Sequence, residues 1–542
     1  MKNIILGSFI ILSSVFSIEK TSDYYQELSD NIRLYFDVML TLNENYVDTA
    51  NIEELMSEGI RAMLSKTDPY TVLLKDNEID HYDELSTGKY GGIGIYLGTS
   101  GQDKRLTVIS PMDDTPASKV GLRAGDRIMF IEDMDTFGMS VKDASKYLKG
   151  EPGTRLKLKV KRSGSDKILD FNLTRASIEI ANIPYSEIID ENIGYIKINE
   201  FSGTLYYDFM SEFEKLISKG ATSLIIDLRY NPGGLLETAV KLSGAFLPKG
   251  KPVVSTRSRD AESEIMYNTY LEPADTEIPV VVMINGSSAS ASEIFAGALQ
   301  DHDRAVIVGE GSFGKGLVQQ LFDVGYYQKK NLKMTIRKYY TPTGRLIQKD
   351  DIFGDRKKNG SDTVFYNSLV NGRPLPSGIG ILPDIPVEPA KNKGYISYLR
   401  MNNFFSDFVY EFYNRNGNYE YDGAMNDDII SDFREFLSDS KSLYTDPGEM
   451  LVDSLLKISG ELGYDELSVS KIMDIKAHIH EMSSNNFDDN IEDIKHNLLI
   501  EFGVYTNGNR EKYRIMNTSD PQLQKAVSVL KNIDTYNSVL GY

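Results

Sequence analysis

The segment that decides the fold of this chain is VVVMINGSSASASEIFAGALQ, residues 280–300. It begins with an apolar run, 280–284, passes through a turn of small residues and continues with apolar positions at helical spacing over 291–300. A short apolar run before a turn is typical of a buried strand, and the second pattern indicates a helix. The segment therefore predicts a strand, a tight turn and a helix of an α/β protein.

Ser290 lies in the predicted turn, directly before the predicted helix. Free backbone N–H groups and the helix dipole favour negative charge at such a place. A serine nucleophile of acyl transfer benefits from this, because its tetrahedral intermediate carries an oxyanion. The alternative is that the serines of this turn only cap the helix, and the segment by itself favours that simpler interpretation.

A serine nucleophile needs a base, and Lys315 is the better of two candidates. His302 follows the predicted helix, whose roughly ten residues span about 15 Å, so His302 would lie far from Ser290. Lys315 follows a predicted strand, 305–308, and stands between two glycines. A lysine has a pKa near roughly 10.4, but burial among small and apolar groups lowers it, and a neutral lysine can take the serine proton. Gln319 would share a face with Lys315 if the segment is helical, and could orient the amine.

Two other motifs offer alternatives for these segments. Gly309, Gly314 and Lys315 have the spacing of a phosphate-binding loop, but Gly316 stands where a serine or threonine would bind Mg²⁺. The GxSxG turn of the α/β-hydrolases is absent around Ser290. Both readings are therefore disfavoured.

A third segment, 223–235, predicts a strand that ends in Asn-Pro-Gly-Gly before a helix. The backbone N–H groups of Gly233 and Gly234, with no side chains in the way, could face a substrate carbonyl. The alternative is an ordinary strand-to-helix turn. Asp227 and Arg229 are close enough in sequence to pair, and structural support is the favoured role for them.

Composition and charge exclude several classes of function. The formal net charge of -20 argues against nucleic acid as a partner, because its phosphates need clustered lysine and arginine. The chain has no cysteine, which excludes disulfides and thiolate metal sites. His478 and His480 are the one close histidine pair, a weak metal signal, so we expect no cofactor and no metal.

Residues 1–17 have the pattern of a signal peptide. Lys2 is followed by an apolar run, 4–16, and Val15 with Ser17 offers a small-residue cleavage site. The run is too short for an ordinary membrane-spanning helix, and an uncleaved N-terminal anchor is the competing interpretation. We expect export to the periplasm or cell envelope, with the protein soluble after signal cleavage or anchored at its N-terminus.

The rest of the chain divides into regions of different pattern. Strands and helices alternate over 176–390, which indicates a layered α/β core. Residues 22–84 show helical patterns whose apolar faces need a partner surface, and 85–175 are β-rich with two short helices. Residues 391–542 are acidic with helical patches and carry no recognisable chemistry.

Motifs in several places resemble, in order, those of the carboxy-terminal processing peptidases, also called tail-specific proteases. They are residues 227–234, 286–293, 314–316 with Gln319, 339–345 and 380–384. With the patterns above, the resemblance implies a multidomain α/β fold with a crotonase-like (ββα) peptidase core and an inserted PDZ domain. The domains would be a signal peptide, an N-terminal helical region, the PDZ domain, the peptidase core and a largely helical C-terminal extension, at 1–17, 22–84, 85–175, 176–390 and 391–542.

The resemblance also implies a serine endopeptidase that cuts proteins near their C-termini with a Ser-Lys dyad. The nucleophile would be Ser290, the general base Lys315, and Gln319 would assist the lysine. The oxyanion hole would be formed by backbone N–H groups of these residues: Ala291 and one of Gly233 and Gly234. A non-catalytic binding protein with the PDZ and crotonase folds is the alternative, and the presence of the whole catalytic set speaks against it.

Residues 85–175 resemble a PDZ domain, which captures an extended C-terminus by strand addition while backbone N–H groups hold the carboxylate. The predicted groove residues are Gly92, Ile93, Gly94, Ile95 and Leu148. For Ile93 and Ile95 alone, a buried strand is the alternative. The expected partners are protein or peptide substrates with free C-termini, and a homodimer through the N-terminal helices and an adaptor protein are further hypotheses.

Overall fold

A computed structural model describes most of the chain and divides it into two units. The described residues are 22–74, 84–100, 103–112, 114–162, 167–260, 263–325, 330–349, 364–390, 394–417, 419, 421, 423–439, 444–483 and 485–542. One unit comprises Met1–Leu73 and Leu321–Met334, and the other Leu74–Gln320 and Thr335–Tyr542. The predicted signal peptide, 1–17, lies outside the described residues.

The first unit contains the two helices α1 (Ser22–Asn45) and α2 (Ile52–Leu64). Asn51 caps α2, because its side chain accepts a hydrogen bond from the Glu54 N–H at 3.3 Å. The two helices touch where Tyr35 of α1 lies against Gly59 of α2. Apolar side chains of α1 such as Ile32 are exposed, and the homodimer through these helices stays a prediction.

The region predicted to be a PDZ domain is a sheet of strand order β3-β4-β5-β7-β8, with β6 beside β5. Its strands and helices are β3 (Ile95–Ser100), β4 (Arg105–Pro111), α4 (Pro116–Lys119), β5 (Arg127–Ile131), β6 (Met134–Asp135), α5 (Val141–Leu148), β7 (Arg155–Lys161) and β8 (Ile168–Thr174). Alternate residues of β7, such as Leu156 and Leu158, face the core, as the two-residue period of a strand requires. β3 is an edge strand. A separate antiparallel pair, β2 (Lys89–Gly92) and β9 (Ala176–Glu179), joins this region to the next.

The central sheet has the strand order β10-β11-β12-β15-β16-β21. Its strands are β10 (Tyr185–Asp190), β11 (Ile193–Lys197), β12 (Ser223–Asp227), β15 (Val280–Ile284), β16 (Val306–Gly309) and β21 (Ile385–Pro386). All neighbours from β11 to β21 are parallel, and only β10 is antiparallel to β11. A parallel sheet must be covered on both faces, so helices are needed on each side.

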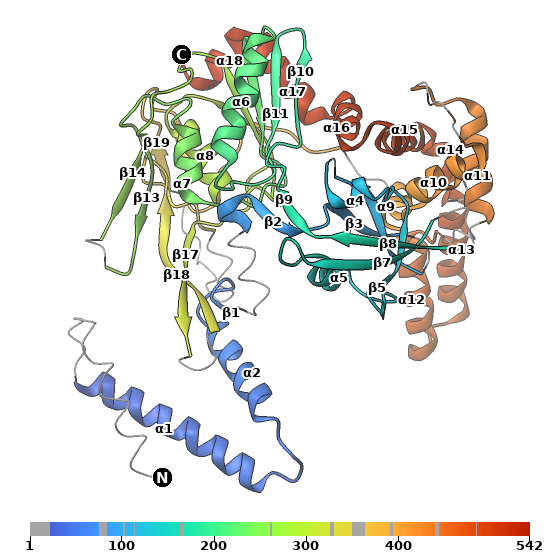
Figure 1. The fold of residues 1–542 in the computed structure, drawn as a ribbon, viewed down its shortest axis with the longest axis horizontal. Coiled ribbons are helices and arrows are strands. Elements are labelled where there is room, and N and C mark those ends of the chain that lie inside the picture. Colours follow the sequence, from blue (N-terminus) through green and yellow to red (C-terminus); the bar gives the residue numbers. More distant parts are fainter. Residues whose placement is uncertain are drawn as a thin grey trace. The chain divides into compact units, whose positions relative to one another are not determined.

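The two faces of the central sheet are covered by helices from different parts of the chain (Figure 1). The helices concerned are α6 (Leu205–Ser218), α7 (Leu236–Ser243), α8 (Ala291–Asp301), α17 (Pro521–Lys531) and α18 (Ile533–Leu540). Val282 of β15 packs in one core with Phe295 of α8, whereas the next residue, Met283, packs in another with Leu523 of α17. The end of the predicted C-terminal extension is therefore an outer layer of the peptidase core.

A second sheet carries Gln319 and Tyr339. Its strands are β1 (Val72–Leu74), β13 (Pro252–Arg257), β14 (Ile265–Asn268), β17 (Leu317–Val324) and β18 (Lys330–Tyr340). β13 pairs with β14 and with residues 338–340 of β18, and β17 pairs with β18. A short pair, β19 (Phe365–Asn367) and β20 (Pro374–Pro376), completes the strands.

The remaining helices follow in the C-terminal part of the chain, and several of them share an aromatic core. They are α9 (Gly394–Met401), α10 (Phe404–Asn416), α11 (Asp427–Asp439), α12 (Pro447–Leu462), α13 (Glu466–Ser483), α14 (Asn486–Asp489), α15 (Ile491–Asn507) and α16 (Asn509–Thr518). Phe408, Phe433 and Phe502 lie at the centre of that core. Among the described residues, no helix is both long enough and apolar enough to cross a membrane.

Candidate active site

Ser290 lies where β15 has ended and α8 begins, as the sequence predicts. It is the N-cap residue of α8 and has φ 55° and ψ -114°, a backbone conformation that is uncommon for a residue with a side chain. Strain of this kind is often held at functional sites by the surrounding structure. Ala291 follows as the first helical residue, and the first N–H groups of a helix have no partner within it. The half-buried Ser290 side chain thus stands at a helix N-terminus.

Glu293 connects Ser290 to the segment that carries Lys315. Its Oε2 accepts hydrogen bonds from the backbone N–H of Ser290 and of Lys315, both at 2.8 Å. Its Oε1 accepts from the Gly314 N–H at 2.6 Å and from the Ser312 hydroxyl at 2.5 Å. One carboxylate therefore brings together the two residues that the sequence predicts as nucleophile and base.

Glu293 is only 1% exposed and has no cation among these four donors. Burial raises the pKa of the Glu293 carboxyl, although the hydrogen bonds from Ser312, Lys315, Ser290 and Gly314 oppose that rise. Three of the four donors are backbone N–H groups, which can only donate, so the carboxyl oxygens must act as acceptors toward Ser290, Gly314 and Lys315. Glu293 is a site residue that is not predicted from the sequence above. Its position three residues after Ser290, the spacing of a capping box, was the available signal.

Gln319 lies on the strand β17, so the helical segment considered for it is wrong. Its Nε2 is buried and, within the part of the chain that the structure describes, has no hydrogen-bond partner. Leaving such an amide unpaired costs about 1–3 kcal/mol. A buried amide without a partner is available to a group that arrives or moves during a reaction.

Gly233 lies against Ser290 with no room for a side chain. It has φ 106°, and a Cβ placed there would lie 2.8 Å from the Ser290 Cβ and 2.9 Å from the Ala291 nitrogen. Its own N–H donates to Asn231 Oδ1 at 2.9 Å. Gly234, with φ 143°, lies against the backbone of Phe201. The structure thus brings the glycine turn next to Ser290 and Ala291.

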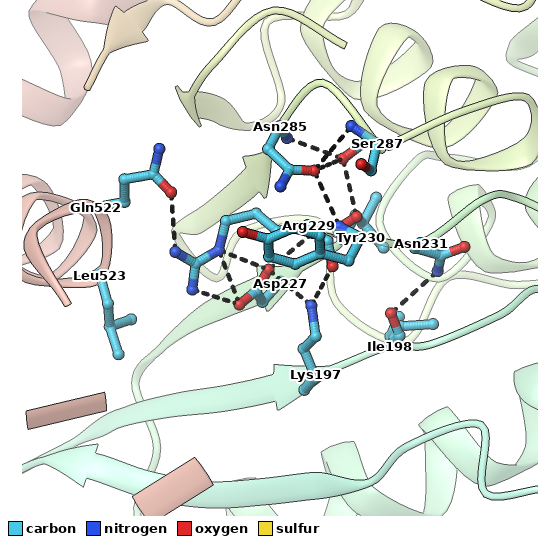
Figure 2. A network of polar contacts seen from close by, with 12 residues as sticks. Lys197, Ile198, Asp227, Arg229, Tyr230, Asn231, Asn285, Ser287, Gln522 and Leu523 are labelled. Carbon is cyan, nitrogen blue, oxygen red and sulfur yellow. Dashed lines mark hydrogen bonds and ion pairs between the residues drawn. The ribbon is translucent and has the colours of Figure 1, made fainter. Parts of the chain in front are cut away.

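The glycine turn follows a buried ionic network, shown in Figure 2. Asp227 accepts hydrogen bonds from Arg229 Nη2 at 2.7 Å, from Tyr195 Oη at 2.7 Å and from Lys197 Nζ at 3.2 Å. Burial by itself raises the pKa of Asp227, but the charges of Lys197 and Arg229 outweigh it and hold the pKa well below its usual range. The predicted pairing of Asp227 with Arg229 is confirmed.

Tyr339 lies close to Ser290, whereas His302 lies at the other end of α8. Tyr339, from the motif 339–345, is buried, which raises the pKa of its phenol, and its interaction with the Ser290 side chain opposes that rise. Its N–H donates to the Gly316 carbonyl at 2.8 Å. His302 caps the opposite end of α8, where its Nε2 lies 2.8 Å from the Pro252 carbonyl oxygen.

The predicted groove residues gather at one edge of the β-rich region. Gly92 ends β2, Ile95 starts β3, and Leu148 is the last residue of α5. The side chains of Ile93 and Leu148 are buried in the core of this region, and Ile95 is partly buried against it. Gly94 has φ 75°, and a Cβ there would lie 2.4 Å from the Thr115 side chain. Beside them lies β3, the edge strand of this sheet among the described residues, whose Thr99 carbonyl accepts from Asn403 Nδ2 at 2.5 Å.

Comparison with known families defines the class of protein. The model for Peptidase family S41 matches residues 192–357, and the model for a PDZ domain matches 107–162. The model named Probable PDZ-protease, C-terminal helical domain matches 395–530. The chain is thus a serine-type endopeptidase built from an S41 core, a PDZ domain and a helical C-terminal domain.

Similar curated proteins narrow this class further. The chain is 33% identical over 396 residues to a carboxy-terminal-processing protease of Bartonella bacilliformis, covering 72% of this chain and 82% of the relative. It is 33% identical over 322 residues to a carboxyl-terminal-processing protease of Synechocystis sp., covering 58% and 74%. The chain belongs to the family of carboxy-terminal processing proteases. A solved photosystem II D1 C-terminal processing protease aligns over 66% of this chain and 92% of its own, with 24% identity and a TM-score of 0.35, too low to inform the fold.

Proposed function

We propose that the chain cleaves protein substrates near their C-termini, with Ser290 as nucleophile and Lys315 as general base. The observation that carries the proposal is the shared acceptor of the two residues, because Glu293 Oε2 binds the backbone N–H of each at 2.8 Å. That contact joins the nucleophile turn to the lysine segment. Gln319, whose buried amide nitrogen has no hydrogen-bond partner among the described residues, is the residue we propose to orient the lysine amine.

The proposed reaction follows from the roles of these side chains. The neutral amine of Lys315 removes the proton of the Ser290 hydroxyl as its oxygen attacks the scissile carbonyl. The resulting ammonium then gives that proton to the leaving amine, and water hydrolyses the acyl-enzyme in a second step. The first intermediate carries an oxyanion, for which preorganised N–H donors are the usual stabiliser.

We propose that the Ala291 N–H is one donor of this oxyanion hole. The second would come from Gly233 or Gly234. Gly233 lies beside Ser290, but its N–H bond to Asn231 would have to be exchanged for the substrate oxygen. If the N–H of Gly234 points toward the substrate oxygen instead, the bond between Gly233 and Asn231 can stay in place.

The PDZ domain is proposed to select free C-termini. The strand β3 lies at the edge of its sheet, the place where an extended peptide is added in a PDZ domain, and the turn of Gly92, Ile93 and Gly94 precedes it. Capture at this edge would raise the local concentration of the substrate at the peptidase core. An adaptor protein and a homodimer remain separate hypotheses about partners.

Export and the finer fold class also belong to this proposal. The pattern of residues 1–17 supports export to the periplasm or cell envelope, with cleavage near Ser17 or retention as an anchor. The repeated strand-helix units of the core support the crotonase-like (ββα) description.

A covalent probe tests the proposal directly. A fluorophosphonate or sulfonyl fluoride should label the full-length protein at Ser290, as mapped by mass spectrometry, because both reagents require an activated hydroxyl. Labelling should be lost in Lys315→Ala, in which the serine remains but its base is gone. Peptide cleavage without labelling of Ser290 would favour another nucleophile. The absence of both cleavage and labelling would favour the non-catalytic binding protein.

A further inference from the structure

Arg229 joins two parts of the chain that are far apart in sequence, the end of β12 and the start of α17. Toward its own strand, its Nη2 donates to Asp227 at 2.7 Å. Toward α17, the same Nη2 lies 2.6 Å from Asp520 Oδ2, and Nη1 donates to Gln522 Oε1 at 2.9 Å. Figure 2 shows Arg229 held between Asp227 and Gln522. The guanidinium therefore connects the start of α17 to β12, the strand that leads into the glycine turn.

The start of α17 is ordered to receive this guanidinium. Asp520 is the N-cap residue, and its Oδ1 accepts from the N–H groups of Gln522 at 2.9 Å and Leu523 at 3.1 Å. Its other oxygen is then free to pair with Arg229. Gln522 Nε2 donates to the Val387 carbonyl at 2.7 Å, which fixes the amide so that its oxygen faces Arg229.

This buried network contains two positive and two negative side chains. Lys197 and Arg229 are cations, Asp227 and Asp520 are anions, and none of the four side chains is more than 18% exposed. Removing one partner of a buried pair leaves its counterpart without compensation. The Asp520 carboxylate thus compensates the positive charge of Arg229. A neutral residue at position 520 would change the contacts that hold the guanidinium.

Arg229 in turn sets the start of the glycine turn. Its N–H donates to Asp227 Oδ1 at 2.9 Å, and its carbonyl accepts from Lys197 Nζ. The next residue, Tyr230, has φ 62°, and its N–H donates to Asn285 Oδ1 at 2.9 Å. Because Gly233 follows within this short turn and lies against Ser290, a displacement of Arg229 would be passed on to the oxyanion-binding groups.

We propose that the N-terminus of α17 is a positioning element of the active site, acting through Asp520 and Gln522 on Arg229. This inference rests on the proposed function, in which the glycine turn holds the substrate carbonyl next to Ser290. Asp520 is a positioning residue in this scheme, since it touches neither substrate nor the reacting atoms. The proposal gives the end of the helical C-terminal domain a part in catalysis.

The test replaces Asp520 by asparagine in the full-length protein. An asparagine side chain has one acceptor and one donor, so it cannot both cap α17 and accept from Arg229. The matched control is Lys531→Gln, which breaks a polar attachment at the opposite end of α17, the ion pair of Lys531 with Asp190 at 2.7 Å. Both variants weaken the docking of the same helix, but only the first touches Arg229.

We expect Asp520→Asn to lower kcat about ten-fold or more while KM changes by less than about two-fold, because misplaced groups act on the transition state. Amide hydrogen exchange over residues 229–235 should become faster in the same variant. Lys531→Gln should match the wild type in both measurements.

Unchanged kcat and unchanged exchange in Asp520→Asn would overturn the proposal. An equal loss in Lys531→Gln would also overturn it, since the effect would then be general loosening of the helix. A wild-type protein without peptidase activity would instead contradict the proposed function, and the exchange of residues 229–235 would still report whether Asp520 holds the turn.

Discussion

Ser290 and Lys315 donate their backbone N–H groups to the same oxygen, Oε2 of Glu293, at 2.8 Å each. The nucleophile turn and the lysine segment are thus fixed to each other through the backbone, whatever rotamers their side chains adopt. Since preorganised geometry is worth several powers of ten in rate, the buried carboxylate between them is the first place to perturb.

Replacing Glu293 by glutamine tests this connection. The glutamine amide nitrogen replaces one acceptor oxygen by a donor, so either the N–H contacts of Ser290 and Lys315 or the N–H contact of Gly314 must be lost. We expect kcat/KM to fall about 100-fold with a folded protein. The control is Glu212→Gln, which breaks an exposed helix ion pair with Lys215 and should be silent. Glu293→Gln with wild-type kcat and an unchanged pH profile would contradict the role of Glu293.

The space at Gly233 gives a second test. Gly233→Ala places a methyl group 2.8 Å from the Ser290 Cβ and should lower kcat/KM about 100-fold or more. Gly220 is the matched control, because it has φ 95° and a Cβ there meets nothing within 4 Å. Gly220→Ala therefore carries similar backbone strain without the clash. Similar kinetics of the two variants would mean that crowding at Ser290 is unimportant.

The Asp227 network makes stability depend on acid pH in a defined direction. A carboxyl whose pKa is depressed on folding adds stability above its unfolded pKa of about 3.9 and loses it as the pH falls through the folded value. We expect Asp227→Asn to be less stable than the wild type by about 3 kcal/mol at neutral pH, because Lys197 and Arg229 stay buried without their counterion.

That difference should persist to about pH 4 and shrink only under stronger acid, because the folded pKa of Asp227 lies well below its usual range. Urea unfolding at several pH values measures it, with Asp143→Asn at the protein surface as a control that should change little. A difference that already vanishes between neutral pH and pH 5 would show that Asp227 titrates normally.

Selection of free C-termini by the PDZ domain can be measured with paired peptides. A peptide with an apolar free C-terminus should have a higher kcat/KM than its C-terminally amidated twin, because amidation removes the carboxylate charge. Gly94→Ala, whose Cβ would lie 2.4 Å from Thr115, should reduce this preference. Gly138→Ala shares the positive φ, 71°, but meets open space, so it should keep the preference. Equal cleavage of both peptides by the wild type would remove the PDZ domain from substrate selection.

Local patterns predicted the elements that position the site. The strand Val280–Ile284 has the predicted bounds, and the helix predicted over 291–300 is found at Ala291–Asp301, because the turn of small residues separates the apolar run from the helical pattern. Gln319 was considered on a helix, whereas it lies on β17, since a short apolar run fits either period. The contact of Asp520 with Arg229 joins residues far apart in sequence, and no local pattern carries that information.

The central claim is tested most directly by the kcat/KM of four proteins on one free-C-terminus peptide: wild type, Ser290→Ala, Lys315→Ala and the double variant. The account predicts that each single variant loses nearly all activity and that the double variant is no worse, because nucleophile and base act as a unit. Lys315→Arg should also be inactive, since a guanidinium does not deprotonate, whereas His302→Ala should stay active. Substantial turnover by folded Ser290→Ala or Lys315→Ala would contradict the assignment of the dyad.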